Sequence, residues 1–170
     1  KNTTGENSIG LFGASGSKLT NSSTGKIQLG TNGVGIWGVN KITTSVSTWG
    51  KNIDITNAGE ITGLANKNSV FGIYADNNIT AYTSATSTIV HSGKIDLSQN
   101  KESVAIYMKN GDLTSTGKIS VNEGSVGVDA TNSNVTINGG TYAIGKESIG
   151  FKLTNVPVTK KFLGNSGNIV

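Results

Sequence analysis

The chain has no cysteine and no arginine, and among its 170 residues there is one proline, one histidine and one methionine. Without cysteine it can form no disulfide and offers no thiolate to a metal ion or a substrate. All 14 basic residues are lysines, which lack the planar guanidinium that pairs with bases and phosphates. No apolar run approaches the ~18 residues of a membrane-spanning helix. We therefore expect no cysteine-based metal site, no nucleic-acid partner and no membrane-embedded segment.

Four small or polar residue types make up half of the chain: 24 Gly, 19 Ser, 21 Thr and 20 Asn. These residues are unfavourable in helix interiors, which excludes a mainly helical protein. Hydrophobic residues still account for 34% of the chain and the net charge is only +4, whereas disordered chains combine low hydrophobicity with high net charge. We expect residues 1–170 to fold as a single domain.

A five-residue phrase recurs six times, and each copy contains an apolar residue, then Gly or Ala, then another apolar residue. The copies are Ser8–Phe12, Gly33–Trp37, Val70–Tyr74, Ser103–Tyr107, Ser125–Asp129 and Ser148–Lys152. Alternation of apolar and other residues over a few positions, bounded by turn residues, is typical of a half-buried strand.

A second phrase, which starts with glycine, lies between the copies of the first: Gly25–Leu29, Gly59–Ile61, Gly93–Leu97, Gly117–Val121, Gly139–Ala143 and Gly167–Ile169. Four residues before each leading glycine there is usually an apolar residue: Ile55, Ile89, Leu113, Val135 and Leu163, with Asn21 as the exception. Each of the six units thus predicts three short strands.

Three strands per unit leave no room for a crossover helix between parallel strands. The pattern therefore predicts an all-β, right-handed parallel β-helix, a solenoid of about six coils of three short strands. A β-sandwich or barrel of antiparallel hairpins is the alternative, but it requires no stacked register. A single coil buries too little apolar surface to offset its loss of backbone entropy, so the coils are expected to fold only when stacked.

Stacking predicts columns of equivalent residues along the axis. Two inward columns are expected: Ile9, Val34, Val104, Val126 and Ile149, and next to it Leu11, Ile36, Ile73, Ile106, Val128 and Phe151. Between them runs a column of tiny residues: Gly10, Gly35, Gly72, Ala105, Gly127 and Gly150. We expect that column to form a flat backbone strip on the surface, over part of which inserted loops fold.

The repeated phrases and their Asn-, Thr- and Ser-rich spacers resemble the passenger domains of large fusobacterial type V autotransporters, the outer-membrane adhesins of the RadD kind. The resemblance covers residues 8–170 and carries no catalytic signature. It implies a segment of an extended β-helical stalk that is exposed on the bacterial cell surface or secreted. It also implies a role in cell adhesion and virulence, with host-cell surface proteins, host glycans or other bacterial cells as partners. We expect the chain to be a fragment of such a longer passenger domain.

The second and third units are longer than the others, because each carries an insertion after its first strand, at about 39–52 and 75–87. Insertions at the same corner of adjacent coils leave the stack side by side, and in solenoids such a face often binds a partner. Trp49 and Tyr82, together with Asp76 and Asn77, are therefore candidate binding residues. A tolerated surface insertion without function is the alternative, because long loops cost little free energy.

Aromatic residues occupy one repeat position in four successive units: Phe12, Trp37, Tyr74 and Tyr107. Each follows an inward residue, so the rings are expected to point outward. Trp37, Tyr74 and Tyr107 are candidate binding residues because flat rings can contact a sugar. The interpretation we favour is that the same rings stack on one another as a structural ladder, which contributes about 0.5–1.5 kcal/mol per pair.

We expect no enzymatic activity and no cofactor or metal. Glycoside hydrolysis needs two facing carboxylates, but the candidates Asp54, Asp96, Asp112 and Asp129 are expected at four different repeat positions. The single histidine, His91, ends a strand with no carboxylate nearby in sequence, and is expected to be a surface or turn residue. The predicted function is that of a non-catalytic cell-surface adhesin or stalk segment. A purely structural spacer and a β-helix enzyme acting on polysaccharides are the alternatives.

Overall fold

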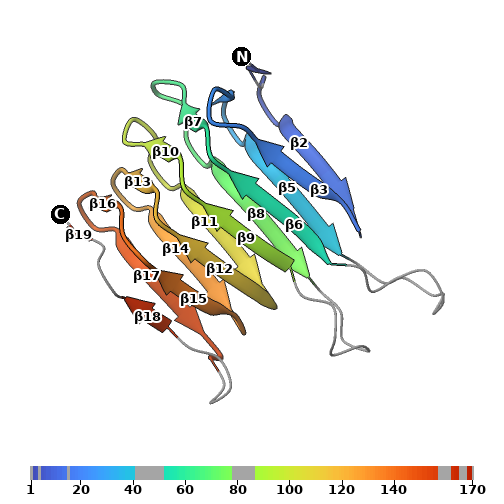
Figure 1. Cartoon of the computed structure of the whole chain (residues 1–170). Coiled ribbons are helices and arrows are strands. Elements are labelled where there is room, and N and C mark those ends of the chain that lie inside the picture. The colour runs from blue at the N-terminus through green and yellow to red at the C-terminus, as the bar shows by residue number, and fades with distance from the viewer. Residues whose placement is uncertain are drawn as a thin grey trace.

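The structure is a computed structural model that describes residues 2–3, 5–14, 16–40, 52–77, 87–156, 162–164 and 168–169. Every regular element in these ranges is a β-strand, and the strands form three parallel sheets of seven, six and six strands. In Figure 1 the strands follow one another coil by coil, and the colour advances steadily along the stack. The predicted fold class, a parallel β-helix of six coils with three short strands each, is confirmed.

One strand of each coil belongs to each sheet. Sheet A contains β1 (Asn2–Thr3), β4 (Lys26–Leu29), β7 (Glu60–Gly63), β10 (Lys94–Leu97), β13 (Lys118–Val121), β16 (Thr141–Ile144) and β19 (Asn168–Ile169). Sheet B contains β2 (Ile9–Ala14), β5 (Val34–Asn40), β8 (Phe71–Asn77), β11 (Val104–Lys109), β14 (Val126–Thr131) and β17 (Ile149–Thr154). Sheet C contains β3 (Lys18–Asn21), β6 (Ile53–Asn57), β9 (Ser87–His91), β12 (Gly111–Ser115), β15 (Asn134–Ile137) and β18 (Phe162–Gly164).

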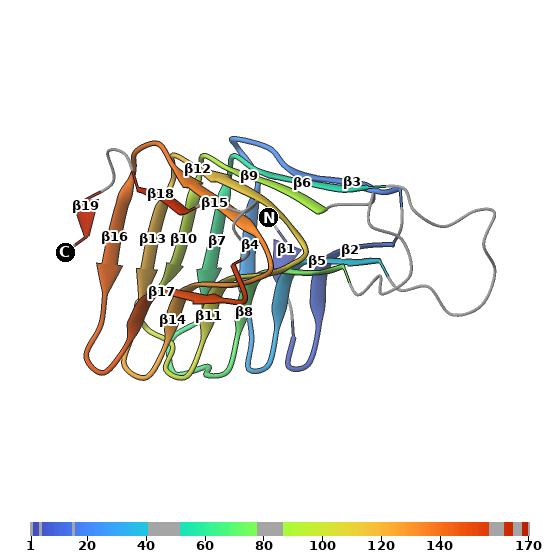
Figure 2. The same ribbon diagram turned by 90° about the horizontal axis from the view of Figure 1, so that it is seen from below.

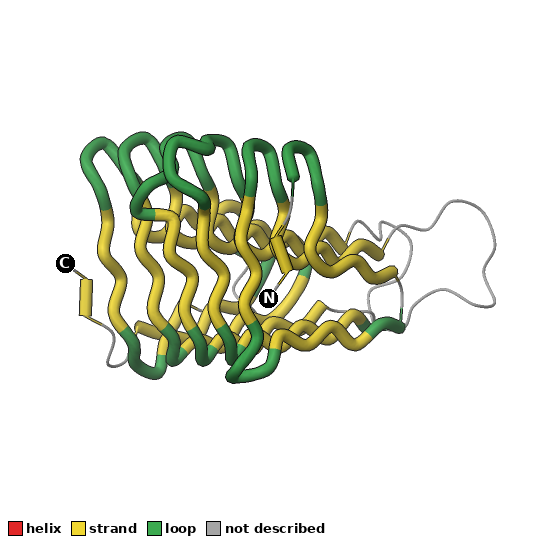
Figure 3. Tube along the Cα trace, turned by 90° about the horizontal axis from the view of Figure 1, so that it is seen from above, coloured by secondary structure: helices red, strands yellow, loops and turns green. Residues whose placement is uncertain are grey.

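The chain passes through sheets B, C and A in turn, so that β2, β3 and β4 form the first coil. Figure 2 shows the sheet A strands in a row with their turns aligned, and Figure 3 shows that the turns form rows along the stack. Strand β1 pairs with β4 ahead of the first coil. Equivalent residues of successive coils are therefore direct neighbours across each sheet.

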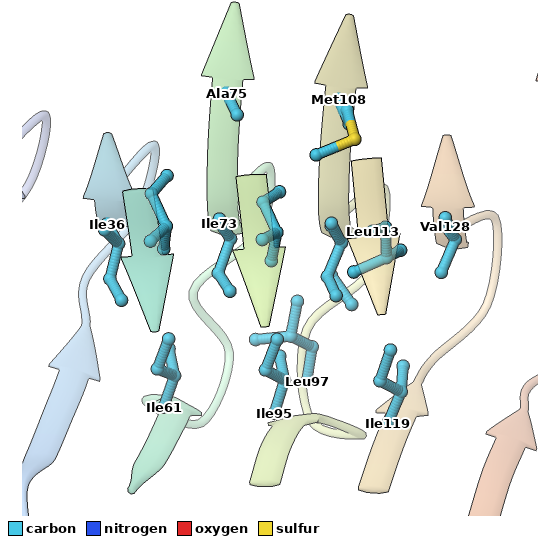
Figure 4. Close-up of a cluster of buried hydrophobic side chains, with 14 of the residues drawn as sticks. Ile36, Ile61, Ile73, Ala75, Ile95, Leu97, Met108, Leu113, Ile119 and Val128 are labelled. Carbon is cyan, nitrogen blue, oxygen red and sulfur yellow. The ribbon is translucent and has the colours of Figure 1, made fainter. Parts of the chain in front are cut away.

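All three sheets send apolar side chains into the interior, and in each sheet one column of aliphatic residues runs through successive coils. Sheet B contributes Ile36, Ile73, Ile106 and Val128, sheet C contributes Ile55, Ile89, Leu113 and Val135, and sheet A contributes Ile27, Ile61, Ile95 and Ile119, all at most 3% exposed. Figure 4 shows the sheet B and sheet A side chains pointing toward one another. Leu11 and Phe151, at the two ends of the predicted sheet B column, are partly buried against this core. The column from Leu11 to Phe151 is confirmed.

The other predicted inward column is wrong, because the alternation of side chains slips by one residue at the glycine of each phrase. Residues such as Gly35 and Ile36 both face inward, and the preceding residue then faces outward. Members of the column Ile9, Val34, Val104, Val126 and Ile149 are half-buried or exposed on the outer side of sheet B.

The column of tiny residues is correspondingly inside the stack, so the predicted surface strip does not exist. A Cβ atom on Gly35 would lie 2.5 Å from the backbone oxygen of Gly72 and 3.0 Å from the Ile61 side chain. Only a very small residue fits between two coils at this point, and no loop can pack on a strip that the core already covers.

The apolar position predicted four residues before each leading glycine lies in sheet C, with corrections in the first and last coils. Leu19 is the register partner of Ile55, so the first coil does have an apolar residue at this position. In the last coil Phe162, not Leu163, pairs with Val135. Asn21 pairs with Asn57 instead, and it belongs to a separate inward column that the sequence interpretation missed.

Serine side chains link the coils at the corner between sheets A and B. The Ser103 backbone N–H donates to Ser125 Oγ at 3.0 Å, and the Ser125 N–H donates to Ser148 Oγ at 3.0 Å. Each hydroxyl also donates to a backbone carbonyl near its own turn. Backbone groups at this buried corner are thereby hydrogen-bonded without a strand partner.

Candidate functional site

The four aromatic residues predicted to share one column lie in register on the outer face of sheet B. Phe12 and Trp37 meet edge to face with ring centroids 5.8 Å apart, and Trp37 and Tyr74 do the same at 5.8 Å. Tyr74 and Tyr107 are stacked, with centroids 4.6 Å apart and an interplanar angle of 14°. The expected outward direction and the expected ladder are both confirmed.

This ladder uses the ring faces for contacts within the protein. Trp37, Tyr74 and Tyr107 are half-buried, while Phe12 at the end of the column is 57% exposed. Tyr74 and Tyr107 are stacked on each other, so the two ring faces that meet in this stack cannot contact a sugar. The structural role of the column is therefore better supported than a sugar platform.

Burial raises the pKa of both tyrosines in the stack. For Tyr74 the nearby charge of Asp76 adds to this effect, and for Tyr107 the neighbouring Tyr74, Asp76 and Asp129 all add to it. Both phenols therefore stay protonated at neutral pH. Further along the column the rings give way to an ion pair, in which Lys152 Nζ lies 2.9 Å from Asp129 Oδ2.

A second, apolar column runs beside the rings: Ile9, Val34, Phe71, Val104, Val126 and Ile149. Phe71 also packs edge to face on Tyr74, with centroids 5.3 Å apart. The outer face of sheet B is thus apolar across several coils, which distinguishes it from the charged outer face of sheet A.

The two insertions follow sheet B strands of adjacent coils. In the second coil β5 ends at Asn40 and β6 begins at Ile53, and in the third β8 ends at Asn77 and β9 begins at Ser87. In the fourth coil a single residue, Asn110, separates β11 from β12. Both insertions therefore connect sheet B to sheet C, on adjacent coils whose strands pair directly. Trp49 and Tyr82 lie outside the described residues.

Asp76 and Asn77 are not in an insertion, because β8 continues through both of them. Asn77 has no exposed surface, and its side-chain amide donates to the Asn110 carbonyl at 3.1 Å. The Asn110 amide donates back to the Asn77 carbonyl at 2.6 Å. The predicted placement of Asn77 in an insertion is therefore wrong, since its side chain points inward from the strand end.

Asp76 is half-buried on the outer side of β8, next to Lys109 of the following coil. Its Oδ1 atom is buried and has no hydrogen-bond partner among the described residues, and the same is true of Trp37 Nε1 and Ser87 Oγ. These three polar atoms belong to the second and third coils, the two that carry the insertions. Of the candidates, Trp37, Tyr74, Asp76 and Tyr107 all lie on the outer face of sheet B.

A buried polar column that the sequence interpretation missed runs inside sheet C, where it pairs Asn21, Asn57, His91 and Ser115. Asn21 Nδ2 donates to Asn57 Oδ1 at 2.8 Å, and Asn57 Nδ2 lies 3.2 Å from His91 Nδ1. His91 Nε2 lies 3.3 Å from the Lys118 carbonyl oxygen, and Tyr142 donates to Ser115 Oγ at 2.7 Å. The signal available in the sequence was the polar residue two places after the inward residue of sheet C in each of the first four coils.

His91 is fully buried, so its predicted place at the surface or in a turn is wrong. Burial lowers its pKa, although its backbone hydrogen bonds act in the opposite direction. A neutral ring fits the geometry, because Nδ1 accepts from Asn57 while Nε2 donates to the Lys118 carbonyl. His91 therefore links coils, and it has no access to a substrate.

A shallow groove of about 410 Å³ crosses the coils at the corner between sheets C and A. The groove is lined by a column of glycines: Gly25, Gly59, Gly93, Gly117 and Gly140. Charged side chains beside the glycines are paired. Glu60 Oε2 lies 3.5 Å from Lys26 Nζ and Glu60 Oε1 lies 3.5 Å from Lys94 Nζ, which is also 2.8 Å from Asp96 Oδ2. Because these opposite charges are paired, the groove is not strongly cationic.

The four candidate aspartates do not occupy four repeat positions, which corrects the sequence interpretation. Asp54 and Asp112 share one outward column of sheet C, two coils apart with Thr88 between them. Asp96 lies on sheet A and Asp129 on sheet B. Within the described ranges no group of three or more His, Asp or Glu side chains is arranged to hold a metal ion.

No protein-family model matches the chain, and neither the curated proteins nor the solved structures contain a significant match to it. In the part of the chain that the structure describes, no helix is long and apolar enough to span a membrane. The candidate functional surface is therefore defined by geometry alone: the outer face of sheet B and its corner with sheet C in the second and third coils.

Proposed function

We propose that the chain is a non-catalytic segment of a bacterial surface adhesin or stalk, part of the passenger domain of a fusobacterial-type autotransporter. In this proposal the segment lies at the cell surface, exposed from the outer membrane or secreted. Its partners are a host-cell surface protein, a host glycan or other bacterial cells. The proposal combines the resemblance of the repeat phrases with the architecture of the chain.

The observation that carries the proposal is the unbroken register of six coils. Each sheet B strand pairs with the next at the same repeat positions, from β2 to β17. A stack in which each coil contacts only its neighbours extends in one dimension, and such solenoids form elongated rods with long binding surfaces. This geometry suits a protein that must reach away from a cell.

The adhesive contact is proposed at the corner where both insertions leave. Both insertions begin at the end of a sheet B strand on adjacent coils, and loops on a rigid scaffold commonly carry binding functions. Trp37 and Asp76 lie on the adjoining face, and each has a buried polar atom without a partner among the described residues. Such atoms are unfavourable unless hydrogen bonds satisfy them.

A binding screen tests this proposal. The chain and a variant that lacks residues 41–51 and 78–86 are labelled and applied to host cells, other bacteria and a glycan array. Binding by the chain that is lost in the shortened variant supports an adhesive segment, provided that both proteins unfold cooperatively. The matched control replaces Lys146, an exposed residue in the turn before the sixth coil, with Gln, and it should bind like the unmodified chain.

A purely structural spacer is the second candidate, and the closed aromatic ladder favours it. The rings of Tyr74 and Tyr107 contact each other and leave no free platform between them. A spacer predicts that neither the chain nor its shortened variant binds any cell or glycan, while both remain folded. Equal binding by the chain and the shortened variant would mean that the contact lies outside the insertions.

A further inference from the structure

Asparagine followed directly by glycine occurs three times in the chain: Asn32–Gly33, Asn110–Gly111 and Asn138–Gly139. In such a pair the backbone nitrogen of the glycine can attack the side-chain carboxamide of the asparagine, because glycine has no side chain to hinder the approach. The reaction is intramolecular, so its rate depends on whether the two groups are free to meet. The structure separates the three pairs on this point.

The first pair is held at both reacting groups. Asn32 Nδ2 donates to Asn7 Oδ1 at 3.0 Å. The Gly33 N–H donates to the Gly30 carbonyl oxygen, also at 3.0 Å. The carboxamide must turn toward the glycine nitrogen, and that nitrogen must give up its proton, so both hydrogen bonds have to break before the attack.

The second pair is held in the same way. Asn110 Nδ2 donates to the Asn77 carbonyl oxygen at 2.6 Å, and Asn110 Oδ1 accepts from Asn132 Nδ2 at 2.5 Å. The Gly111 N–H is buried and donates to Ser133 Oγ at 3.1 Å. This pair is therefore also protected by the fold.

The third pair lies at the corner between sheets C and A, where the fifth coil has one residue more than the fourth. Ser115 pairs with Ile137 in sheet C, and Lys118 pairs with Thr141 in sheet A. Two residues separate Ser115 from Lys118, whereas three separate Ile137 from Thr141. The turn of the fifth coil must accommodate the extra residue between strands that remain in register.

The extra residue leaves one backbone N–H without an acceptor. In the second, third and fourth coils two successive N–H groups at this corner donate to one carbonyl of the coil before, as Gly117 donates to the His91 carbonyl oxygen at 3.2 Å. In the fifth coil the Asn138 N–H donates to the Ser115 carbonyl oxygen at 2.9 Å, but the Gly139 N–H has no acceptor among the described residues. Asn138 is exposed, and its side chain has no hydrogen-bond partner in the same ranges.

We propose that Asn138–Gly139 is a site of spontaneous deamidation in the folded protein, with water as the only co-reactant. The Gly139 nitrogen forms a bond to Asn138 Cγ as the Cγ–Nδ2 bond breaks. The proton of the Gly139 nitrogen passes through solvent to the departing nitrogen, which leaves as ammonia. Water then opens the cyclic imide at one of its two carbonyl groups, and position 138 becomes an aspartate or a β-linked aspartate.

Either product alters the corner between sheets C and A. The net charge falls by one unit from +4, and the new carboxylate lies in the turn between β15 and β16. The equivalent turn of the fourth coil contains Thr116 and Gly117, which line the groove at this corner. Because the reaction needs no enzyme and releases ammonia, the modified fraction grows with the age of the protein, independently of the proposed adhesive role.

Peptide mapping by mass spectrometry tests the proposal, after incubation of the folded chain in mildly alkaline buffer. We expect Asn138 to lose its amide about tenfold or more faster than Asn32 and Asn110, because two hydrogen bonds must break at each of those pairs. In urea that unfolds the chain, the three rates should become similar. An Asn138 that reacts no faster than the other two in the folded chain would overturn the proposal, as would the same rate ratio in urea.

Deletion of Gly139 gives a matched variant, because it restores the corner length of the fourth coil and still leaves Asn138 followed by a glycine, Gly140. The N–H of that glycine can then donate to the Ser115 carbonyl oxygen, as Gly117 donates to His91. Deamidation of the folded variant should be about fivefold or more slower than in the parent chain, and equal to it in urea. An equal rate in the two folded proteins would show that the extra residue does not create the site.

Discussion

Gly59 occupies the turn from sheet C into sheet A, directly against the same turn of the first coil. A Cβ atom at this position would lie 2.2 Å from the Ser22 carbonyl oxygen and 2.4 Å from the Gly25 carbonyl oxygen. Both neighbours are backbone atoms, which cannot move aside as a flexible side chain can. Glycine at this corner is therefore dictated by the spacing between coils.

Gly59→Ala is expected to lower the free energy of unfolding by about 1–3 kcal/mol, because the two coils must separate to admit the methyl group. Urea denaturation followed by circular dichroism measures the change. Gly150→Ala is the matched control: its Cβ atom would lie 3.6 Å from the nearest Ile144 atom, an ordinary contact, so its effect should stay within about 0.5 kcal/mol. Equal losses in the two variants would contradict the explanation.

His91 makes the stability of the stack depend on pH. Burial lowers the pKa of the folded His91 ring, whereas the unfolded chain protonates it near the usual value of about 6.5. As the pH falls below that value, the unfolded state takes up a proton that the folded state excludes. The free energy of unfolding is therefore expected to fall by up to about 1.4 kcal/mol per pH unit.

Urea denaturation between about pH 7.5 and 5.5, where carboxylates stay ionised, isolates this effect. His91→Asn continues the asparagine column of Asn21 and Asn57 with a side chain that does not titrate. Its stability should be nearly constant over this range, whatever its absolute value. The same pH dependence in His91→Asn as in the unmodified chain would show that another group is responsible.

At the scale of the strands, the outer face of sheet B is held by its side chains as well as by its backbone. The stacked pair Tyr74 and Tyr107 spans β8 and β11, at a centroid distance of 4.6 Å. Aromatic contacts of this kind contribute beyond the burial of each ring. The ladder thus adds to the rung-to-rung contacts that hold the coils together.

A double-mutant cycle of Tyr74→Leu and Tyr107→Leu is expected to give a coupling free energy of about 0.5–1.5 kcal/mol. Unfolding free energies of the four proteins supply the measurement. The control cycle combines Tyr74→Leu with Thr136→Ala on the outer face of sheet C, and these two changes should be additive. Additive effects in the Tyr74 and Tyr107 cycle would mean that the rings do not support each other.

Sequence repeats predicted the strands well because the recognised inward columns contain an apolar residue in every coil. The columns from Leu11 to Phe151 in sheet B and from Ile55 to Val135 in sheet C were recognisable for this reason. At Gly35 and Ile36 two successive residues face inward, which strict alternation does not predict. This exception depends on how closely the backbones of adjacent coils approach. The burial of Asn57 and His91 was missed for a related reason: their hydrogen-bond partners lie in other coils.

The candidate site was less predictable than the fold. The sequence located the corner of the insertions and the outward aromatic column, since both follow from counting positions in the repeat. It placed Asp76 and Asn77 in an insertion because the recurring phrase ends at Tyr74, whereas β8 continues through both. The inward turn of Asn77 depends on its exchange of hydrogen bonds with Asn110 in the next coil.

On the scale of the whole molecule, the account requires that equivalent repeat positions lie directly over one another. The proposed rod and the roles of the glycine and aromatic columns all depend on this stacking. Outward residues of sheet C provide a clear probe, because Thr114 and Thr136 are register partners on adjacent coils. Thr20 lies in the same column, three coils before Thr114.

Disulfide formation between introduced cysteines tests the stacking most directly, because the chain has no cysteine of its own. Adjacent strands lie about 4.8 Å apart, within the Cα separation that a disulfide tolerates. Under mild oxidation, Thr114→Cys with Thr136→Cys should form an intramolecular disulfide in the native protein. Thr20→Cys with Thr114→Cys, about 14 Å apart, should not. The reverse result, with the distant pair linked and the adjacent pair free, would contradict the stacked β-helix.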